Sequence, residues 1–358
     1  MTEVIARYSY RAKRSPRETA RKIALESSTV IWKYGKRDLR KKHMARVLKA
    51  EKNGAEIAFP LENFGCSITK LLSAVAGEGV FYSGVADDVK LADLQLPSAF
   101  LRGFGGPKFG IMGLRRLLNV YRRPLFCGVV KPNIGLKPKE FAQLAYEGLA
   151  GGLDAVKDDE MQADESYSRL ATRVRLTMAA LHKAEDETGE KKMYVANITD
   201  DAEKIAKLHD VVTENGGNCA MINAFPVGIT SSFLVPKTIP LMAHFTVSAS
   251  CTRIAPHVLT LLQRVAGFDI IGNPGLGKRM NSNEAEVMAN AKACRLRLGS
   301  LRPSLPAFGG SDSAATISRY SFLGNDVMII MGGGVYGHPT GPRTGAESVR
   351  DAWAKGRR

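Results

Sequence analysis

The chain has 358 residues, 44% of them hydrophobic and 24% charged, and its formal net charge is +16. This composition is ordinary for a globular protein and excludes a collagen-like, disordered or disulfide-scaffold chain. No apolar run approaches the roughly 20 residues that cross a bilayer. The amino terminus also lacks a secretory signal, so we expect a cytoplasmic protein with no membrane segment.

Most of the positive excess lies in the first 55 residues. Such an excess fits either a nucleic-acid-binding face, or a solvated surface whose field attracts anionic substrates. The only aromatic residues among these basic ones are Tyr8, Tyr10, Trp32 and Tyr34, too few for a platform on which bases stack. Nucleic acid is therefore the weaker alternative. The five cysteines form no CxxC pair, which predicts reduced thiols and neither a zinc site nor a disulfide framework.

The first 105 residues mix strand and helix patterns. We expect strands at 4–10, 56–60 and 89–96, and helices at 17–26 and 68–76. This order predicts a small α+β domain of the ferredoxin-like kind, with helices on one face of an antiparallel sheet. A segment rich in glycine and proline, 104–124, marks the boundary. We therefore predict an N-terminal domain at 1–110 and a second domain at 122–358.

The second domain alternates apolar runs with helical patterns. The predicted strands are 125–130, 153–156, 193–197, 220–223, 241–247, 269–271, 305–308 and 327–331. The predicted helices are 141–150, 168–184, 202–214, 258–267, 284–297, 314–323 and 345–355, with only a weak helix in the fourth interval, after Pro226. Eight such units predict a (β/α)8 TIM barrel, and strands buried on both faces are continuous apolar runs of this kind.

The second strand of the barrel ends in Lys157 and three acids, Asp158, Asp159 and Glu160. Alternation along a strand sends Lys157 and Asp159 to one side, and Glu160 can join them where the strand gives way to a loop. Two converging carboxylates suit Mg²⁺. Lys157 would then form an ion pair, or become a third ligand if its amine were converted to a carbamate. The alternative is a solvated acidic loop.

Other polar residues follow strand ends, where barrel enzymes place their active sites. Lys131 follows the first strand and is a candidate base or electrophile, unless it only extends its charge to solvent. His244 ends the fifth strand, and Lys278 and Arg279 lie in the loop after the sixth. The glycines after the last two strands predict a phosphate site, although tight turns also use glycine; they are Gly309, Gly310, Gly332 and Gly333.

The run Gly151–Glu160, together with Ala24–Trp32 and the glycine clusters in this order, resembles the large chain of ribulose bisphosphate carboxylase (RuBisCO). The resemblance is strongest to RuBisCO-like (form IV) proteins of photosynthetic bacteria. It implies a homodimer with active sites at the subunit interface. It also implies Mg²⁺ bound by Asp159, Glu160 and a carbamate formed from Lys157 and CO2. Lys131 is implied as an acid/base and His244 as a substrate-binding residue. Glu26, Thr29 and Trp32 are implied to complete the partner's site.

Several positions depart from the carboxylases. Asn133 stands where they have a second lysine, Phe245 where an arginine holds the second phosphate, and Phe308 where they have a serine. An arginine-to-phenylalanine change removes a bidentate phosphate clamp. We therefore expect no carboxylase. Both phenylalanines would favour a substrate whose far end is uncharged or thioether-like.

The expected reaction is Mg²⁺-dependent enolisation or isomerisation of a small phosphorylated ketose or acid sugar, in sulfur (methylthio-sugar) metabolism. The base would be Lys131, the carbamate on Lys157, or Lys108, which matches a base in the related methionine-salvage enolases. The alternatives are a non-catalytic stress- or sulfur-linked homologue and an authentic carboxylase.

Overall fold

The computed structural model describes residues 2–30, 37–277, 280, 282–310 and 312–356. They form two compact units. The first unit comprises Met1–Gly105, Val247–Val265 and Arg297–Leu301, and the second comprises Gly106–Thr246, Ala266–Leu296 and Arg302–Arg358. The sequence-based division into 1–110 and 122–358 assigns Val247–Val265 and Arg297–Leu301 to the second domain, whereas here they belong to the first unit. That division stays a prediction.

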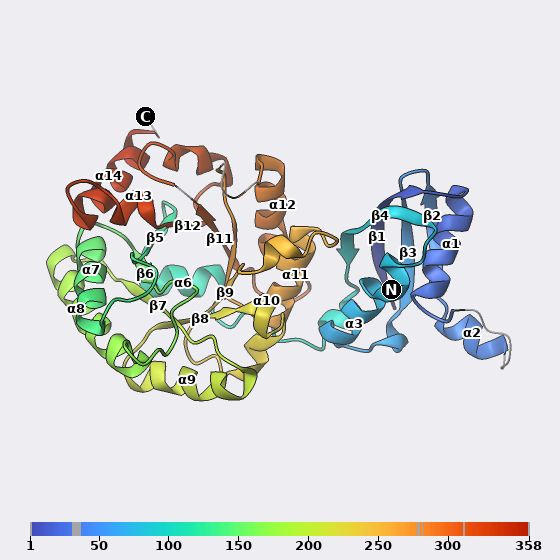
Figure 1. Ribbon diagram of the computed structural model, residues 1–358, viewed down its shortest axis with the longest axis horizontal. Helices are drawn as coiled ribbons and strands as arrows, with labels where there is room; N and C mark the ends of the chain where they lie inside the picture. Colours follow the sequence, from blue (N-terminus) through green and yellow to red (C-terminus); the bar gives the residue numbers. More distant parts are fainter. Residues whose placement is uncertain (1, 31–36, 278–279, 281, 311, 357–358) are drawn as a thin grey trace. The chain divides into compact units, whose positions relative to one another are not determined.

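The first unit contains an antiparallel sheet with the strand order β2-β3-β1-β4 (Figure 1). Its strands are β1 (Glu3–Ala12), β2 (Arg46–Glu51), β3 (Gly54–Pro60) and β4 (Ala86–Gln95). Alternate residues of β1 are buried, including Val4, Ala6 and Tyr8, so one face of the sheet carries the core of this unit. The α+β prediction for this part of the chain is confirmed.

Two helices of the first unit begin after a serine that caps them. Helix α1 (Pro16–Glu26) starts after Ser15, whose hydroxyl accepts the Glu18 amide, and α3 (Ile68–Val75) starts after Ser67 in the same way. The remaining helical elements are α2 (Arg37–His43), η1 (Leu61–Asn63), α4 (Glu78–Phe81), α5 (Ser98–Leu101), η3 (Ser248–Ser250) and α11 (Pro256–Ala266).

The second unit is a closed barrel of eight parallel strands, which confirms the TIM-barrel prediction. The strands are β5 (Leu125–Val129), β6 (Ala155–Lys157), β7 (Met193–Asn197), β8 (Cys219–Asn223), β9 (Leu241–His244), β10 (Ile270–Pro274), β11 (Leu305–Gly310) and β12 (Met328–Met331). Helical elements of the unit are α6 (Gly110–Leu118), α7 (Pro138–Ala150), α8 (Leu170–Thr188), α9 (Ala202–Glu214), α10 (Ala224–Val227), η2 (Ser231–Leu234), α12 (Glu284–Arg295), η4 (Ile317–Leu323), α13 (Gly333–Tyr336) and α14 (Pro342–Lys355).

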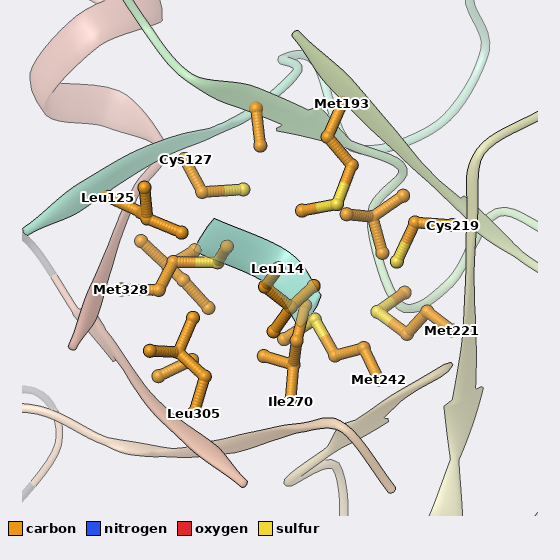
Figure 2. Packing of buried hydrophobic residues seen from close by; sticks show 14 of the residues in the cluster. Leu114, Leu125, Cys127, Met193, Cys219, Met221, Met242, Ile270, Leu305 and Met328 are labelled. Atoms are coloured by element: carbon orange, nitrogen blue, oxygen red, sulfur yellow. The ribbon is translucent and has the colours of Figure 1, made fainter. Parts of the chain in front are cut away.

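Helix α6 closes the amino-terminal end of the barrel. Figure 2 shows Leu114 of this helix surrounded by the first residues of several strands, among them Leu125, Met193 and Leu305. All of these side chains are inaccessible to solvent. The interior is therefore packed at this end, and a substrate has access only to the carboxyl ends of the strands.

One predicted helix differs in kind. The pattern at 314–323 predicts an α-helix, but Ile317–Leu323 forms the 3-10 helix η4. This segment is rich in serine, aromatic and β-branched residues, which have a modest intrinsic preference for the α-helix, and Gly324 follows it with a positive φ of 73°. In the described part of the chain, no helix is both long and apolar enough to span a membrane.

Candidate active site

Lys157 is the last residue of β6 and is completely buried. Its amine donates a hydrogen bond of 2.6 Å to the carbonyl of Asp158. Burial lowers the pKa of the Lys157 amine, because removal from water disfavours the ammonium form. Glu160 and Asp159 oppose this effect, since their negative charges favour that form. The amine therefore lies within the field of both carboxylates.

Lys131 reaches the same place from the loop after β5. Its amine forms an ion pair of 2.7 Å with Asp159, whose side chain is only 1% exposed. A Cβ atom on Gly332 would lie 2.9 Å from Cε of Lys131, so the glycine gives the lysine room to pass. The structure thus brings Lys131, Lys157 and Asp159 together, at the carboxyl ends of β5 and β6.

His244 approaches Glu160 from β9. Its Nε2 lies 3.7 Å from Oε2 of Glu160, and its Nδ1 accepts the backbone amide of Thr246 at 3.2 Å. Burial lowers the pKa of His244 well below its usual value, and the positive charges of Lys157 and Lys131 lower it further. The ring is therefore neutral at pH 7 and offers Nε2–H as a hydrogen-bond donor.

Asp158 points away from the barrel interior. Its carboxylate binds Arg173 of α8, accepts the Tyr194 hydroxyl at 2.7 Å and accepts the Asn197 amide at 2.8 Å. The alternation expected along this strand is therefore present, with Asp158 directed to the layer between strands and helices. Asp158 therefore stabilises the backbone of the site and does not face the barrel mouth.

The residues present fit a divalent cation only if Lys157 is modified. Among the described residues, no group of three or more His, Cys, Asp and Glu side chains is arranged to hold a metal ion. Asp159 and Glu160 supply two carboxylates, and a carbamate on the buried Lys157 would supply the third oxygen ligand. Such an all-oxygen set suits Mg²⁺.

The glycine clusters lie side by side at the ends of the last two strands. Gly309 and Gly310 end β11, while Gly332 and Gly333 begin the turn into α13. A Cβ atom on the next glycine, Gly334, would come within 1.9 Å of the Asp312 carbonyl, so glycine is required for this close approach.

Asp312 is a buried carboxylate beside these glycines. One of its oxygens accepts the Tyr320 hydroxyl at 2.7 Å and lies 3.2 Å from the position of a Cβ atom on Gly310. Burial raises the pKa of Asp312, because the ionised form loses its hydration. The side chain of Ser311, the intervening residue, is outside the described part. A phosphate held by Gly309 and Gly310 would therefore lie beside the carboxylate of Asp312.

Phe245 lines the barrel mouth. Its ring stacks on His244 with 4.6 Å between the centroids. Cβ atoms on Gly272 and Gly309 would lie 3.5 and 3.4 Å from the ring, so these glycines leave the space that it fills. The ring gives the mouth an apolar wall between β9 and β11.

Phe308 does not share this role, and the expectation that it faces the substrate is wrong. It is fully buried and stacks on Tyr320 of η4, with 6.3 Å between the centroids. Its neighbours in β11, Leu305 and Ala307, belong to the cluster inside the barrel. Alternation therefore turns Phe308 to the outside of the barrel.

Lys108 does not join the site of its own chain. The amides after it, those of Phe109 and Gly110, bind Asp269, which precedes β10 at the amino-terminal end of the barrel. Its own carbonyl accepts Arg302, which precedes β11. The structure therefore does not bring Lys108 to the site of its own chain, and its role as a base stays a prediction. Asn133 lies half-buried in the loop that carries Lys131.

The residues expected to complete a partner's site belong to the first unit. Glu26 ends α1 and pairs with Lys22, and the half-buried Thr29 follows in the turn. Trp32, Lys278 and Arg279 lie outside the described residues.

Two asparagines of the site were missed in the sequence. Asn197 ends β7 and Asn223 ends β8, and both side-chain amides donate to the carbonyl of Glu160, at 3.2 and 2.8 Å. The sequence could have identified them by their position at strand ends, because polar residues there face the barrel mouth. Arg173 was missed because nothing in a helix sequence shows which strand it faces.

Comparison with known proteins places both units in one family. The model of the ribulose bisphosphate carboxylase large chain, N-terminal domain, matches residues 1–100, and that of the catalytic domain matches residues 110–357. Ribulose bisphosphate carboxylase-like protein 2 of Rhodopseudomonas palustris is 42% identical over 94% of this chain and 86% of its own. The ribulose bisphosphate carboxylase-like protein of Chlorobaculum tepidum is 47% identical over 83% of this chain and 70% of its own.

Solved structures agree with these matches. The octameric ribulose-1,5-bisphosphate carboxylase/oxygenase of Pyrococcus horikoshii superposes with a TM-score of 0.91 at 32% identity. The superposition covers 99% of this chain and 88% of the archaeal one.

Proposed function

The chain belongs to the ribulose bisphosphate carboxylase large-chain family, and we propose that it is a RuBisCO-like enzyme rather than a carboxylase. Its reaction would be the Mg²⁺-dependent enolisation or isomerisation of a small phosphorylated ketose or acid sugar. The observation that carries the proposal is the convergence of Lys131, Lys157, Asp159, Glu160 and His244 beside the apolar ring of Phe245.

Asp159, Glu160 and a carbamate on Lys157 would hold the cation, and the bound ion would polarise a substrate carbonyl. Carbamate formation joins the neutral amine to CO2 and releases one proton. The burial of Lys157 favours this step, because it lowers the pKa of the amine and so increases the share of the neutral form that reacts with CO2. CO2 and Mg²⁺ would therefore act as cofactors of the site.

The chain's own residues would move the proton and hold the substrate. Lys131 or the carbamate would take the proton next to the carbonyl, since both lie at the same strand ends. His244 would donate Nε2–H to a substrate oxygen. The glycines after β11 and β12 would hold one phosphate through their backbone amides. Phe245 would contact an uncharged far end, for which a thioether is well suited.

Proton exchange in D2O tests the proposal. With Mg²⁺ and bicarbonate, we expect the hydrogen next to the carbonyl of 5-methylthioribulose 1-phosphate to exchange, while that of ribulose 1,5-bisphosphate does not. Lys157→Ala, Asp159→Ala and Lys131→Ala should abolish exchange. Lys204→Ala, on the exposed face of α9, should leave it unchanged. Absence of exchange with either compound would favour a non-catalytic homologue, and exchange of the bisphosphate would favour an authentic carboxylase.

We also propose a homodimer in which Glu26, Thr29 and Trp32 complete the partner's active site. In each active site, Glu26 and Lys157 then come from different subunits. A mixture of inactive Glu26→Gln and Lys157→Ala subunits should therefore regain exchange activity after dissociation and reassembly, because one hybrid site contains neither change. No recovery, with hybrid dimers shown by mass spectrometry, would contradict the shared site.

A further inference from the structure

Glu160 lies beyond the secondary structure that carries the rest of the site. Strand β6 ends at Lys157, and the chain continues as an irregular loop. No strand ladder therefore fixes the backbone of Glu160, although its carboxylate must face His244 and the lysines. The carbonyl oxygen of Glu160 instead accepts two side-chain amides, from Asn197 and Asn223.

Each amide is held so that its nitrogen faces Glu160. Oδ1 of Asn197 accepts both the amide and the hydroxyl of Thr199, at 3.0 and 2.6 Å, which leaves Nδ2 for the carbonyls of Asp159 and Glu160. The backbone amide of Asn223 binds the same Thr199 hydroxyl at 2.9 Å. Both asparagines are thus tied to the same threonine.

Asn223 also connects Glu160 with His244. Its Oδ1 lies 3.5 Å from the hydroxyl of Thr246, which in turn lies 2.6 Å from Nδ1 of His244. The chain of contacts runs from the backbone of Glu160 to the imidazole that faces the carboxylate of the same residue. Asn197 and Asn223 are both at most 6% exposed, so water cannot easily replace either bond.

We propose that Asn223, supported by Asn197, is a positioning residue that holds Glu160 in the orientation needed to bind a divalent cation. Neither asparagine touches the cation; both act through the backbone of Glu160. The proposal rests on the metal site of the proposed function. Loss of a hydrogen-bonded partner behind a metal ligand typically weakens metal binding 10- to 100-fold.

Mn²⁺ binding, followed by the electron paramagnetic resonance signal of the free ion in the presence of bicarbonate, tests this without any substrate. We expect Asn223→Ala and Asn197→Ala each to raise the Kd for Mn²⁺ at least about tenfold. The matched control is Asn218→Ala, which also loses two side-chain hydrogen bonds but at the amino-terminal end of the barrel. It should bind Mn²⁺ as the unmodified chain does.

The outcomes separate this inference from the proposed function. If the unmodified chain binds no Mn²⁺, the proposed function fails. If it binds Mn²⁺ and Asn223→Ala binds equally well, only the positioning role is overturned. Equal weakening in Asn218→Ala would also overturn it, because a general loss of stability would then explain the effect. Should Asn223→Ala fail to fold, Asn223→Ser and Asn197→Ala decide by the same measurement.

Discussion

Arg173 and Asp158 form two parallel hydrogen bonds of 3.1 Å, and both side chains are completely excluded from solvent. The pair joins helix α8 to the backbone between Lys157 and Asp159. Arg173 also donates to the carbonyls of Ser168 and Ala163 in the loop that follows the site. One buried guanidinium therefore fixes both the end of β6 and the start of α8.

We expect Arg173→Met to lower the free energy of unfolding by about 3–5 kcal/mol, because it leaves the Asp158 carboxylate buried without its counter-ion. Urea unfolding followed by circular dichroism measures this. Lys204→Ala, which breaks the exposed pair with Asp200 on α9, should lower it by less than about 1 kcal/mol. Similar losses in the two variants would show that the Asp158 carboxylate finds other partners.

Phe245 should set the specificity at the far end of the substrate. We expect Phe245→Arg to improve binding of ribulose 1,5-bisphosphate about tenfold, since a guanidinium can pair with the second phosphate, and to weaken binding of the methylthio monophosphate. Isothermal titration of each compound checks this. Phe308→Leu is the control, because that ring packs against Tyr320 outside the barrel, and it should leave the ratio of the two affinities unchanged.

Asp312 should weaken phosphate binding when it is ionised. We expect Asp312→Asn to bind inorganic phosphate roughly tenfold more tightly at pH 8, because one negative charge beside Gly310 is removed. The advantage should shrink as the pH falls, since Asp312, whose pKa is raised by burial, becomes protonated in the unmodified chain. Asp351→Asn, an exposed change on α14, alters the net charge equally and should have no such effect. Weaker phosphate binding by Asp312→Asn would place the phosphate elsewhere.

His209 of α9 should make the fold sensitive to acid. It is 1% exposed, and burial lowers the pKa of its imidazole more than Asp210, whose Oδ1 lies 3.8 Å from Nδ1, raises it. The pKa of the imidazole is lower in the folded chain than in the unfolded chain, where it is about 6.5. The free energy of unfolding is therefore highest above about pH 6.5 and decreases as the pH falls below that value. Thermal unfolding between pH 7.5 and 5 should show a smaller decrease in His209→Leu than in the unmodified chain. Parallel profiles would show that His209 stays neutral or gains a partner.

Much of the fold was predictable because its signals are local. Each barrel strand is buried on both faces, so it is a short continuous apolar run that is visible without knowledge of its neighbours. Strand β2 was missed for the opposite reason. Its sequence, Arg46–Glu51, mixes charged and apolar residues at an exposed edge of the sheet, where burial imposes no pattern.

Some positions of the site residues could likewise be predicted from local sequence, and others could not. Alternation along one strand placed Lys157 and Asp159 on the same side, and the same rule, applied to β11, would have turned Phe308 outward. Local rules could not show that Lys108 lies at the amino-terminal end of the barrel. That position depends on the contact of α6 with Asp269, 159 residues away from Gly110.

The sequence alone thus determined the two kinds of architecture, the family resemblance and the strand ends that carry the reactive groups, because periodicity and motifs act over a few residues. Only the tertiary structure decided that His244 meets Glu160, that Arg173 neutralises Asp158, and that Asn197 and Asn223 share one carbonyl oxygen. These contacts join different strands and helices. Their distances are set by closure of the barrel and by packing of α8 against it, which no local pattern encodes.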